Sequence, residues 1–190
     1  LALNSKHTKK KWLSDLKKIL NNEQKRFSIS LSGGDTVYSS KLVITIAVIG
    51  YSKKKPIFRN SCRLNDDIYV TGSIGDSFLG LNVIKKKKNF GRLNSYFINK
   101  YYEPNLQNNF YLYLNKIASS SIDISDGLNI DLKNLISKTK YGAVVNLNDI
   151  PLSLHSSILV KKKLIKVENI FSRGDDYQIL FTSNKKNRLY

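Results

Sequence analysis

Carboxylates beside glycines are the residues of this sequence best suited to chemistry. Only 14 of the 190 residues are Asp or Glu, yet Asp35, Asp76, Asp126 and Asp175 each adjoin a glycine. Several of these turns follow an expected strand or open an expected helix, so the carboxylate sits at the end of a rigid element. Magnesium usually takes one or two carboxylates plus substrate phosphates, and glycines and helix N-termini offer backbone N–H groups to phosphate. The turns therefore suit a metal–nucleotide site.

Taken singly, these motifs have simpler explanations. Gly-Asp pairs are ordinary turn chemistry, and Asp is a good helix cap. The stretch Gly72-x-x-Gly75-Asp76 matches neither the Walker nor the Rossmann pattern. The segment Asp123-x-Ser125-Asp126-Gly127 indicates a binding site more specifically, because it places two carboxylates and a hydroxyl just before an expected helix. A cap does not need so many polar groups, although capping remains an alternative.

The hydrophobic pattern predicts the elements that must position these turns. Apolar residues recur at helical spacing in three segments, the turn at 72–76 opens a fourth helix, and short β-branched or apolar runs indicate strands between them. The expected helices are 10–20, 76–88, 106–117 and 128–136, the expected strands are 27–31, 42–49, 67–71, 143–147 and 177–182, and 89–104 is expected to be loop. Helices and strands intermingle, so the fold class is α/β or α+β.

The strong positive charge raises the question of nucleic-acid binding. The net charge is +18, but only 6 of the 32 basic residues are Arg, the residue favoured for specific phosphate and base contacts. AT-rich coding would give the same bias toward lysine. The lysine runs are scattered along the chain, at 9–11, 53–55, 85–88 and 161–163. We expect them to be dispersed, solvated surface and predict no nucleic-acid partner; a polyanion-binding face is the alternative.

Other features bound the compartment and the completeness of the chain. No apolar run approaches the roughly 18 residues of a membrane helix, so no membrane partner is predicted. Cys62 is the only cysteine, which fits a reduced, cytoplasmic compartment. The sequence has no methionine and has apolar residues near both ends. We therefore expect an internal piece of a longer protein.

An ordered set of motifs resembles one known family. Each motif is weak alone, but together they span about residues 10–185. They are Gly33-Gly34-Asp35-Thr36, the run 44–49 with Gly50, Arg59, Ile68-Tyr69-Val70-Thr71-Gly72, Gly75-Asp76-Ser77, Gly80-Leu81, Ala118, Ile122-Asp123-Ile124-Ser125-Asp126-Gly127-Leu128, Asp131-Leu132, Gly142-Ala143 and Gly174-Asp175-Asp176-Tyr177. The set resembles thiamine-monophosphate kinase, of the aminoimidazole ribonucleotide synthetase-like superfamily.

The resemblance implies a two-domain, homodimeric enzyme. Residues 1–50 would be the tail of its N-terminal ATP- and metal-binding domain, and 51–190 most of its C-terminal α/β domain, truncated at the end. The family uses ATP and Mg2+ to transfer the γ-phosphoryl group directly to thiamine monophosphate, giving thiamine diphosphate. With most of the first domain missing, the chain alone is expected to be inactive.

Site residues follow from the resemblance position by position. Gly34 and Asp35 would meet ATP, with Asp35 also on magnesium, and Arg59 would bind ATP phosphates. Asp123 and Asp126 would hold magnesium, facing Asp35. Ser125 would contact ATP, and the helix beginning near Leu128 would add N–H donors. No catalytic nucleophile is implied.

Asp175 would lie at the thiamine-phosphate site. One departure from the family pattern lies close to it: Arg173 precedes Gly174 where the family usually has a second glycine. This puts the backbone shape near Asp175 in doubt. The alternatives to the kinase are a sister synthetase, of the aminoimidazole ribonucleotide or selenophosphate type, and a basic nucleic-acid-binding module.

Overall fold

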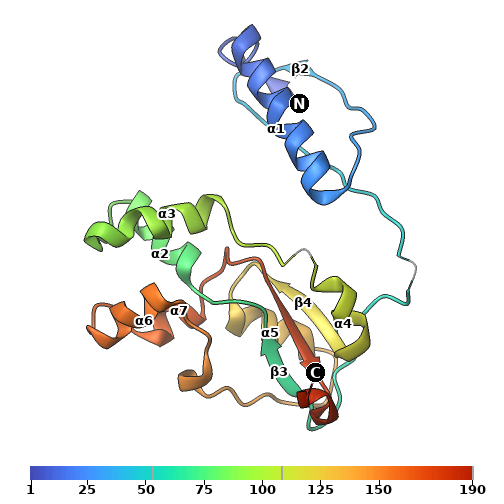
Figure 1. Ribbon diagram of the computed structural model, residues 1–190, viewed down its shortest axis with the longest axis vertical. Coiled ribbons are helices and arrows are strands. Elements are labelled where there is room, and N and C mark those ends of the chain that lie inside the picture. Colours follow the sequence, from blue (N-terminus) through green and yellow to red (C-terminus); the bar gives the residue numbers. More distant parts are fainter. Residues whose placement is uncertain (53, 108, 190) are drawn as a thin grey trace. The chain divides into compact units, whose positions relative to one another are not determined.

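The computed structural model describes residues 1–52, 54–107 and 109–189, so Lys53 of the second lysine run lies outside the described residues. The chain divides into two compact units, residues 1–52 and the remainder (Figure 1). In the described ranges no helix is both long and apolar enough to cross a membrane. The predicted division into two enzyme domains stays a prediction.

The first unit is one long helix with two short strands. β1 (Ala2–Leu3) pairs in parallel with β2 (Val37–Tyr38). α1 covers Lys10–Phe27 and is therefore longer than the helix predicted at 10–20. Its C-cap residue, Ser28, has the left-handed conformation. The predicted strand at 27–31 is therefore wrong at its first residue, which is still helical, and residues 29–31 are irregular.

The predicted buried strand at 42–49 is also wrong. Its only recorded pairing is an isolated bridge between Val43 and Ala2, and Ile46, Val48 and Ile49 are 69%, 77% and 89% exposed. β propensity reflects how well a side chain fits a half-covered sheet. Within the described part of this unit, only Val43 of the run reaches a strand, through its bridge to Ala2 of β1. The β-branched composition alone therefore does not form a strand.

The second unit is built on a three-stranded antiparallel sheet (Figure 1). Its strands are β3 (Asp67–Val70), β4 (Ala118–Ile124) and β5 (Gln178–Ser183), in the order β3-β5-β4. Val70 pairs with Leu180, and Ile124 pairs with Gln178. Because β5 is antiparallel to both neighbours, β3 and β4 end at the edge of the sheet where β5 begins.

β4 was not predicted, and the helix before it is shorter than predicted. The strand reads Ala-Ser-Ser-Ser-Ile-Asp-Ile, whose three serines hide the strand pattern. α4 (Tyr111–Ile117) runs directly into it, whereas the helix was expected to begin at 106. The predicted strand at 143–147 is wrong: the segment is irregular, Val144 is 95% exposed, and a 3-10 turn follows at Leu147–Asp149.

Helices pack around two groups of buried side chains. α2 (Asp76–Ile84) is shorter than expected, and the predicted loop 89–104 contains the 3-10 turn Gly91–Leu93 and α3 (Asn94–Tyr102). α3 buries Phe97 completely against Leu79 of α2 and Leu159 of α6 (Leu154–Lys161). α7 (Val167–Phe171) adds Ile170 to the main core.

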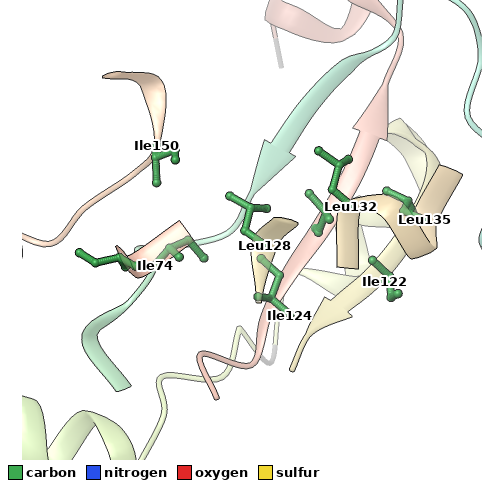
Figure 2. Packing of buried hydrophobic residues seen from close by; sticks show 9 residues of the cluster. Ile74, Ile122, Ile124, Leu128, Leu132, Leu135 and Ile150 are labelled. Atoms are coloured by element: carbon green, nitrogen blue, oxygen red, sulfur yellow. The ribbon is translucent and has the colours of Figure 1, made fainter. Parts of the chain in front are cut away.

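The main core lies between the sheet and α5 (Leu128–Ile136), the helix predicted at this place. Figure 2 shows Ile122 and Ile124 of β4 near Leu128, Leu132 and Leu135 of α5. Since side chains alternate along a strand, Asp123 between the two isoleucines projects to the opposite face and is exposed. The core thus fixes which way this carboxylate points.

The closest helix contact depends on a glycine. A Cβ atom at Gly80 of α2 would lie 2.0 Å from the backbone oxygen of Phe97 in α3. We predict that Gly80→Ala forces the helices apart and lowers the free energy of unfolding by about 1–3 kcal/mol, as overpacking does. Urea denaturation of the purified chain measures this.

Gly142→Ala is the matched control, because nothing lies within 4 Å of the added methyl group and φ is not positive. It is expected to change the free energy of unfolding by no more than about 0.5 kcal/mol. Equal effects of the two substitutions would show that the α2–α3 contact is not as close as described.

Candidate functional site

Three turns meet where β3 and β4 end and β5 begins. The backbone N–H of Asp175 donates to the carbonyl of Ser125 (3.0 Å), and that of Tyr177 to the carbonyl of Ile124 (2.9 Å). The turn after β3 joins them, because the N–H of Gly75 donates to Oδ2 of Asp176 (2.8 Å). Motifs separated by up to 100 residues of sequence therefore form one cluster.

Two of the turns touch backbone to backbone, which explains their glycines. A Cβ at Gly174 would lie 1.9 Å from the carbonyl oxygen of Ser125. One at Gly127, whose φ is +123°, would lie 2.8 Å from the backbone nitrogen of Arg173. Neither glycine can be replaced without separating the turns, and separation would move Asp126 away from Asp175.

Buried Asp131 in the first turn of α5 organises the turn after β4. Its Oδ2 accepts the backbone N–H groups of Ser125, Asp126 and Gly127, each at 3.0 Å, and the residue is 2% exposed. Hydrogen bonds to a charged group contribute about 1.5–3 kcal/mol each. These three donors precede α5 and are already satisfied by Asp131. Donation to phosphate by the first N–H groups of α5 stays a prediction. Sequence reasoning gave Asp131 no role.

Asp123 and Asp126 are the exposed carboxylates of this edge. Within residues 109–189 no hydrogen bond or ion pair is recorded for either carboxylate, so both are free to accept a ligand. Ser125, between them, is half-buried. The donor set fits Mg2+, which needs only one or two protein carboxylates when phosphates supply further oxygens. Among the residues described, no group of three or more His, Cys, Asp and Glu could hold a metal ion without such help.

The turn that contains Asp175 is conformationally strained. Asp175 and Tyr177 have φ values of 68° and 51°, a region that non-glycine residues rarely adopt, and least often bulky ones. Such strain persists only where the surroundings hold it, and it is common at functional sites. Here the backbone bonds to Ser125 and Ile124 hold the turn, and Asp175 is half-buried.

Arg173 is accommodated without distortion. It is not among the described residues of positive φ, so its backbone conformation does not demand glycine. Its guanidinium lies over the ring of Phe78, 5.4 Å from the centroid, and its N–H donates to the carbonyl of Ile170. The backbone at Arg173 therefore does not need the conformational freedom of a second glycine.

Two further carboxylates are buried on the β3 side of the cluster. Asp76 accepts hydrogen bonds from the hydroxyls of Tyr96 (2.7 Å), Ser153 (2.8 Å) and Ser156 (2.6 Å), so its role is structural. Asp176 is 4% exposed. Burial raises the pKa of its carboxyl to about 7, although backbone N–H donors at Gly75 and Ser77 act in the opposite direction. A pocket of about 70 Å³ adjoins both carboxylates.

Of the other predicted residues, Arg59 lies apart from this cluster. Arg59 is exposed, and the next residue, Asn60, donates its N–H to the carbonyl of Leu135 (2.8 Å), near the C-terminal end of α5. Asp126 lies at the N-terminal end of that helix, which is roughly 13 Å long. Gly34 and Asp35 belong to the first unit, where Asp35 is exposed and accepts the N–H of Thr36 (2.7 Å). The structure thus gathers Asp123, Ser125, Asp126 and Asp175, and does not bring Arg59 beside them.

The third lysine run, at 85–88, lines a hollow on the surface. Lys86, Lys87 and Lys88 line a surface hollow of about 490 Å³ together with Val83, Asn89 and Asn94. It lies at the C-terminal end of α2, whereas the turns meet at its N-terminal end. The expected dispersal of the four lysine runs stays a prediction.

Comparison with curated proteins finds relatives over almost the whole chain. A thiamine-monophosphate kinase of Buchnera aphidicola subsp. Acyrthosiphon pisum (strain APS) is 37% identical over 183 residues, which cover 94% of this chain and 54% of that protein. The chain thus spans about half the length of the curated relative. No protein-family model matches the sequence.

Solved structures share the fold. The crystal structure of thiamine monophosphate kinase from Aquifex aeolicus matches 97% of this chain and 63% of its own, with a TM-score of 0.82 and 23% identity. A structure described as AaThiL complexed with AMPPCP and TMP matches 97% of this chain and 60% of its own, with a TM-score of 0.79 and 22% identity. Together with the observed mixture of helices and strands, this confirms the predicted α+β class.

The raised pKa of Asp176 predicts how stability depends on pH. Between about pH 4 and pH 7 the folded state keeps a proton that the unfolded state has released. The contribution of Asp176 to the free energy of unfolding therefore falls as pH rises through this window and is constant above it. The side chain of the Asp176→Asn variant cannot titrate. The free energy of unfolding of this variant should therefore rise relative to that of the wild type as pH increases through the window.

Urea unfolding of both proteins at several pH values measures the difference. The difference between the two curves should change between about pH 4 and pH 7 and level off above. Parallel curves through the whole window would contradict the pKa shift.

Proposed function

We propose that this chain, which is homologous over almost its whole length to thiamine-monophosphate kinases, is part of an enzyme that uses ATP to phosphorylate thiamine monophosphate. The homology supports the reaction class. The chain spans about half the relative's length, so the activity of the whole protein is part of the proposal. A homodimer, a cytoplasmic location and the division into two enzyme domains belong to it as well.

The observation that carries the proposal is the backbone contact between the turns at Asp126 and Asp175. This contact keeps the turn that carries Asp126, with Asp123 at the end of β4, next to the strained turn that contains Asp175. Both carboxylates, Asp123 and Asp126, are exposed. A phosphoryl transfer between two phosphate-bearing substrates needs such a place, where two anionic groups can be brought together. Its catalysis is mostly positioning and charge neutralisation.

Each residue has a distinct part in the proposed reaction. Asp123 and Asp126 would hold magnesium, Ser125 would contact ATP, and Asp175 would bind thiamine monophosphate. Bound magnesium would neutralise the charge that develops on the transferred phosphoryl group. Without it, the carboxylates at this edge would repel a triphosphate.

The remaining predicted residues would also bind the nucleotide. Gly34 and Asp35 would meet ATP from the first unit, with Asp35 also on magnesium. Arg59 would meet ATP phosphates, and its position near the far end of α5 requires its long side chain or the nucleotide to bridge that distance. We propose direct, in-line transfer of the γ-phosphoryl group, with no covalent intermediate on the protein.

The 190-residue chain alone is predicted to form no thiamine diphosphate at an enzyme-like rate from ATP, Mg2+ and thiamine monophosphate. A chimera that restores the part of the Buchnera relative not covered by this chain is predicted to form it. Chromatographic separation of the thiamine phosphates measures both. A chimera that folds but stays inactive, with ATP hydrolysis also absent, would refute the proposed function.

In the active chimera, Asp126→Asn is predicted to lower kcat by about 100-fold or more, since it removes charge stabilisation at the reacting phosphates. Asp126 is exposed, so the free energy of unfolding should change by less than about 0.5 kcal/mol. Asp149→Asn is the matched control, because Asp149 is also an exposed aspartate but lies in the 3-10 turn before Ile150. Near-normal turnover by the Asp126 variant would refute its role.

A further inference from the structure

Asp131 is a buried acid whose carboxylate binds the backbone of the turn that carries Asp126, and the proposed reaction gives it no part. We propose that Asp131 is a positioning residue that sets the affinity of Asp123 and Asp126 for a divalent cation. The inference rests on the proposed function, because it assumes that this edge of the sheet binds a metal ion. It adds a residue that touches neither metal nor substrate.

The geometry gives Asp131 control of the turn. Helical side chains lean toward the N-terminus of their helix, so an aspartate in the first turn of α5 reaches back over the residues that precede the helix. Its Oδ2 collects the N–H groups of three consecutive residues, Ser125 to Gly127. Three peptide groups that aim at one atom have their orientations fixed together.

These hydrogen bonds also fix the direction of the Ser125 carbonyl and the position of Asp126. The N–H of Asp126 points to Asp131, so the Ser125 carbonyl of the same peptide group points the opposite way, to the N–H of Asp175. The Asp126 side chain stays exposed. The same oxygen therefore fixes the direction of Asp126 and the docking of the turn that contains Asp175. Without the hydrogen bonds to Asp131, these backbone groups could rotate, and the position of the Asp126 carboxylate relative to that of Asp123 would no longer be fixed.

Charge adds to the effect of geometry. The ion pairs recorded within the described ranges are Glu23–Arg26 and Asp67–Arg188, so no basic side chain is recorded as neutralising Asp131. Its hydrogen bonds are charge-assisted and stronger than those of a neutral acceptor. The buried charge also makes the potential at the edge more negative, which favours a cation there. Asparagine preserves the shape and removes both contributions.

Asp76 provides a matched comparison for a purely structural role. It is also a buried aspartate, 4% exposed, that accepts three hydrogen bonds. Its donors are the hydroxyls of Tyr96, Ser153 and Ser156, on α3 and at the start of α6, and none belongs to the turn at 125–127. Loss of Asp76 would weaken the fold and leave the metal-binding edge as it is.

The test is a Mn2+ titration of the 15N-labelled 190-residue chain followed by NMR. In the wild type, Mn2+ is expected to broaden the amide signals around 123–127 selectively. Asp131→Asn is expected to raise the Mn2+ concentration at half-broadening by about 10- to 100-fold, as loss of a group that orients metal ligands does. Asp76→Asn is expected to leave that concentration at its wild-type value.

The outcomes separate this inference from the proposed function. Selective broadening with the same midpoint in the wild type and Asp131→Asn would overturn the inference alone. No selective broadening in the wild type would overturn the metal site and the inference with it.

Hydrogen exchange in the wild type keeps the inference testable if Asp131→Asn does not fold. The amides of Ser125, Asp126 and Gly127 are expected to be protected from exchange, and Asp131→Ser then replaces the Asn variant in the titration. Exchange of these three amides at the rate of an unstructured peptide would overturn the inference.

Discussion

The continuation of the β4–β5 pairing beyond the ends of both strands is the constraint on which the candidate site depends. The regular ladder ends at Ile124 and Gln178, yet the backbone bonds from Tyr177 to Ile124 and from Asp175 to Ser125 follow it directly. Turns normally leave a sheet edge in different directions. Here they stay in backbone contact, and that contact requires Gly127 and Gly174 because any Cβ would separate them.

This close contact concentrates acidic groups, and the structure sorts them by what they bind. Asp76, Asp131 and Asp176 are buried and accept hydrogen bonds from the protein itself. Asp123 and Asp126 are exposed, and their carboxylates are left for a ligand. The buried acids fix the backbone of the turns, and the exposed acids can act only because the backbone is fixed. Arg173 fits this arrangement, since its side chain leaves the crowded turn to lie over Phe78.

The sequence predicted the turns better than it predicted the elements between them. α5 could be found because its apolar residues recur at helical spacing after Gly127, and β3 and α2 because the glycine turn at 72–75 separates an apolar run from a helix. β5 could be found from its apolar composition. β4 could not, since its serines give no strand pattern, and its pairing with β5 joins residues about 60 apart in sequence. The 42–49 run shows the opposite error, because a strand-like composition forms a strand only with a partner.

The candidate residues were likewise predictable only in part. Asp123, Ser125 and Asp126 stand together in the sequence, and the motif resemblance added Asp175 from 49 positions away. Asp131 belongs to the motif set but was given no role, because its importance lies in one oxygen that three backbone groups share. Arg59 illustrates the converse, since a matching motif position does not by itself place a side chain beside the cluster.

Anomalous scattering from crystals grown with Mn2+ and a non-hydrolysable ATP analogue tests the central claim most directly. The account predicts a manganese peak about 2 Å from carboxylate oxygens of both Asp123 and Asp126, with the analogue's phosphates on its open side. A bound analogue whose manganese lies away from both carboxylates would contradict the assignment of this sheet edge as the metal–nucleotide site.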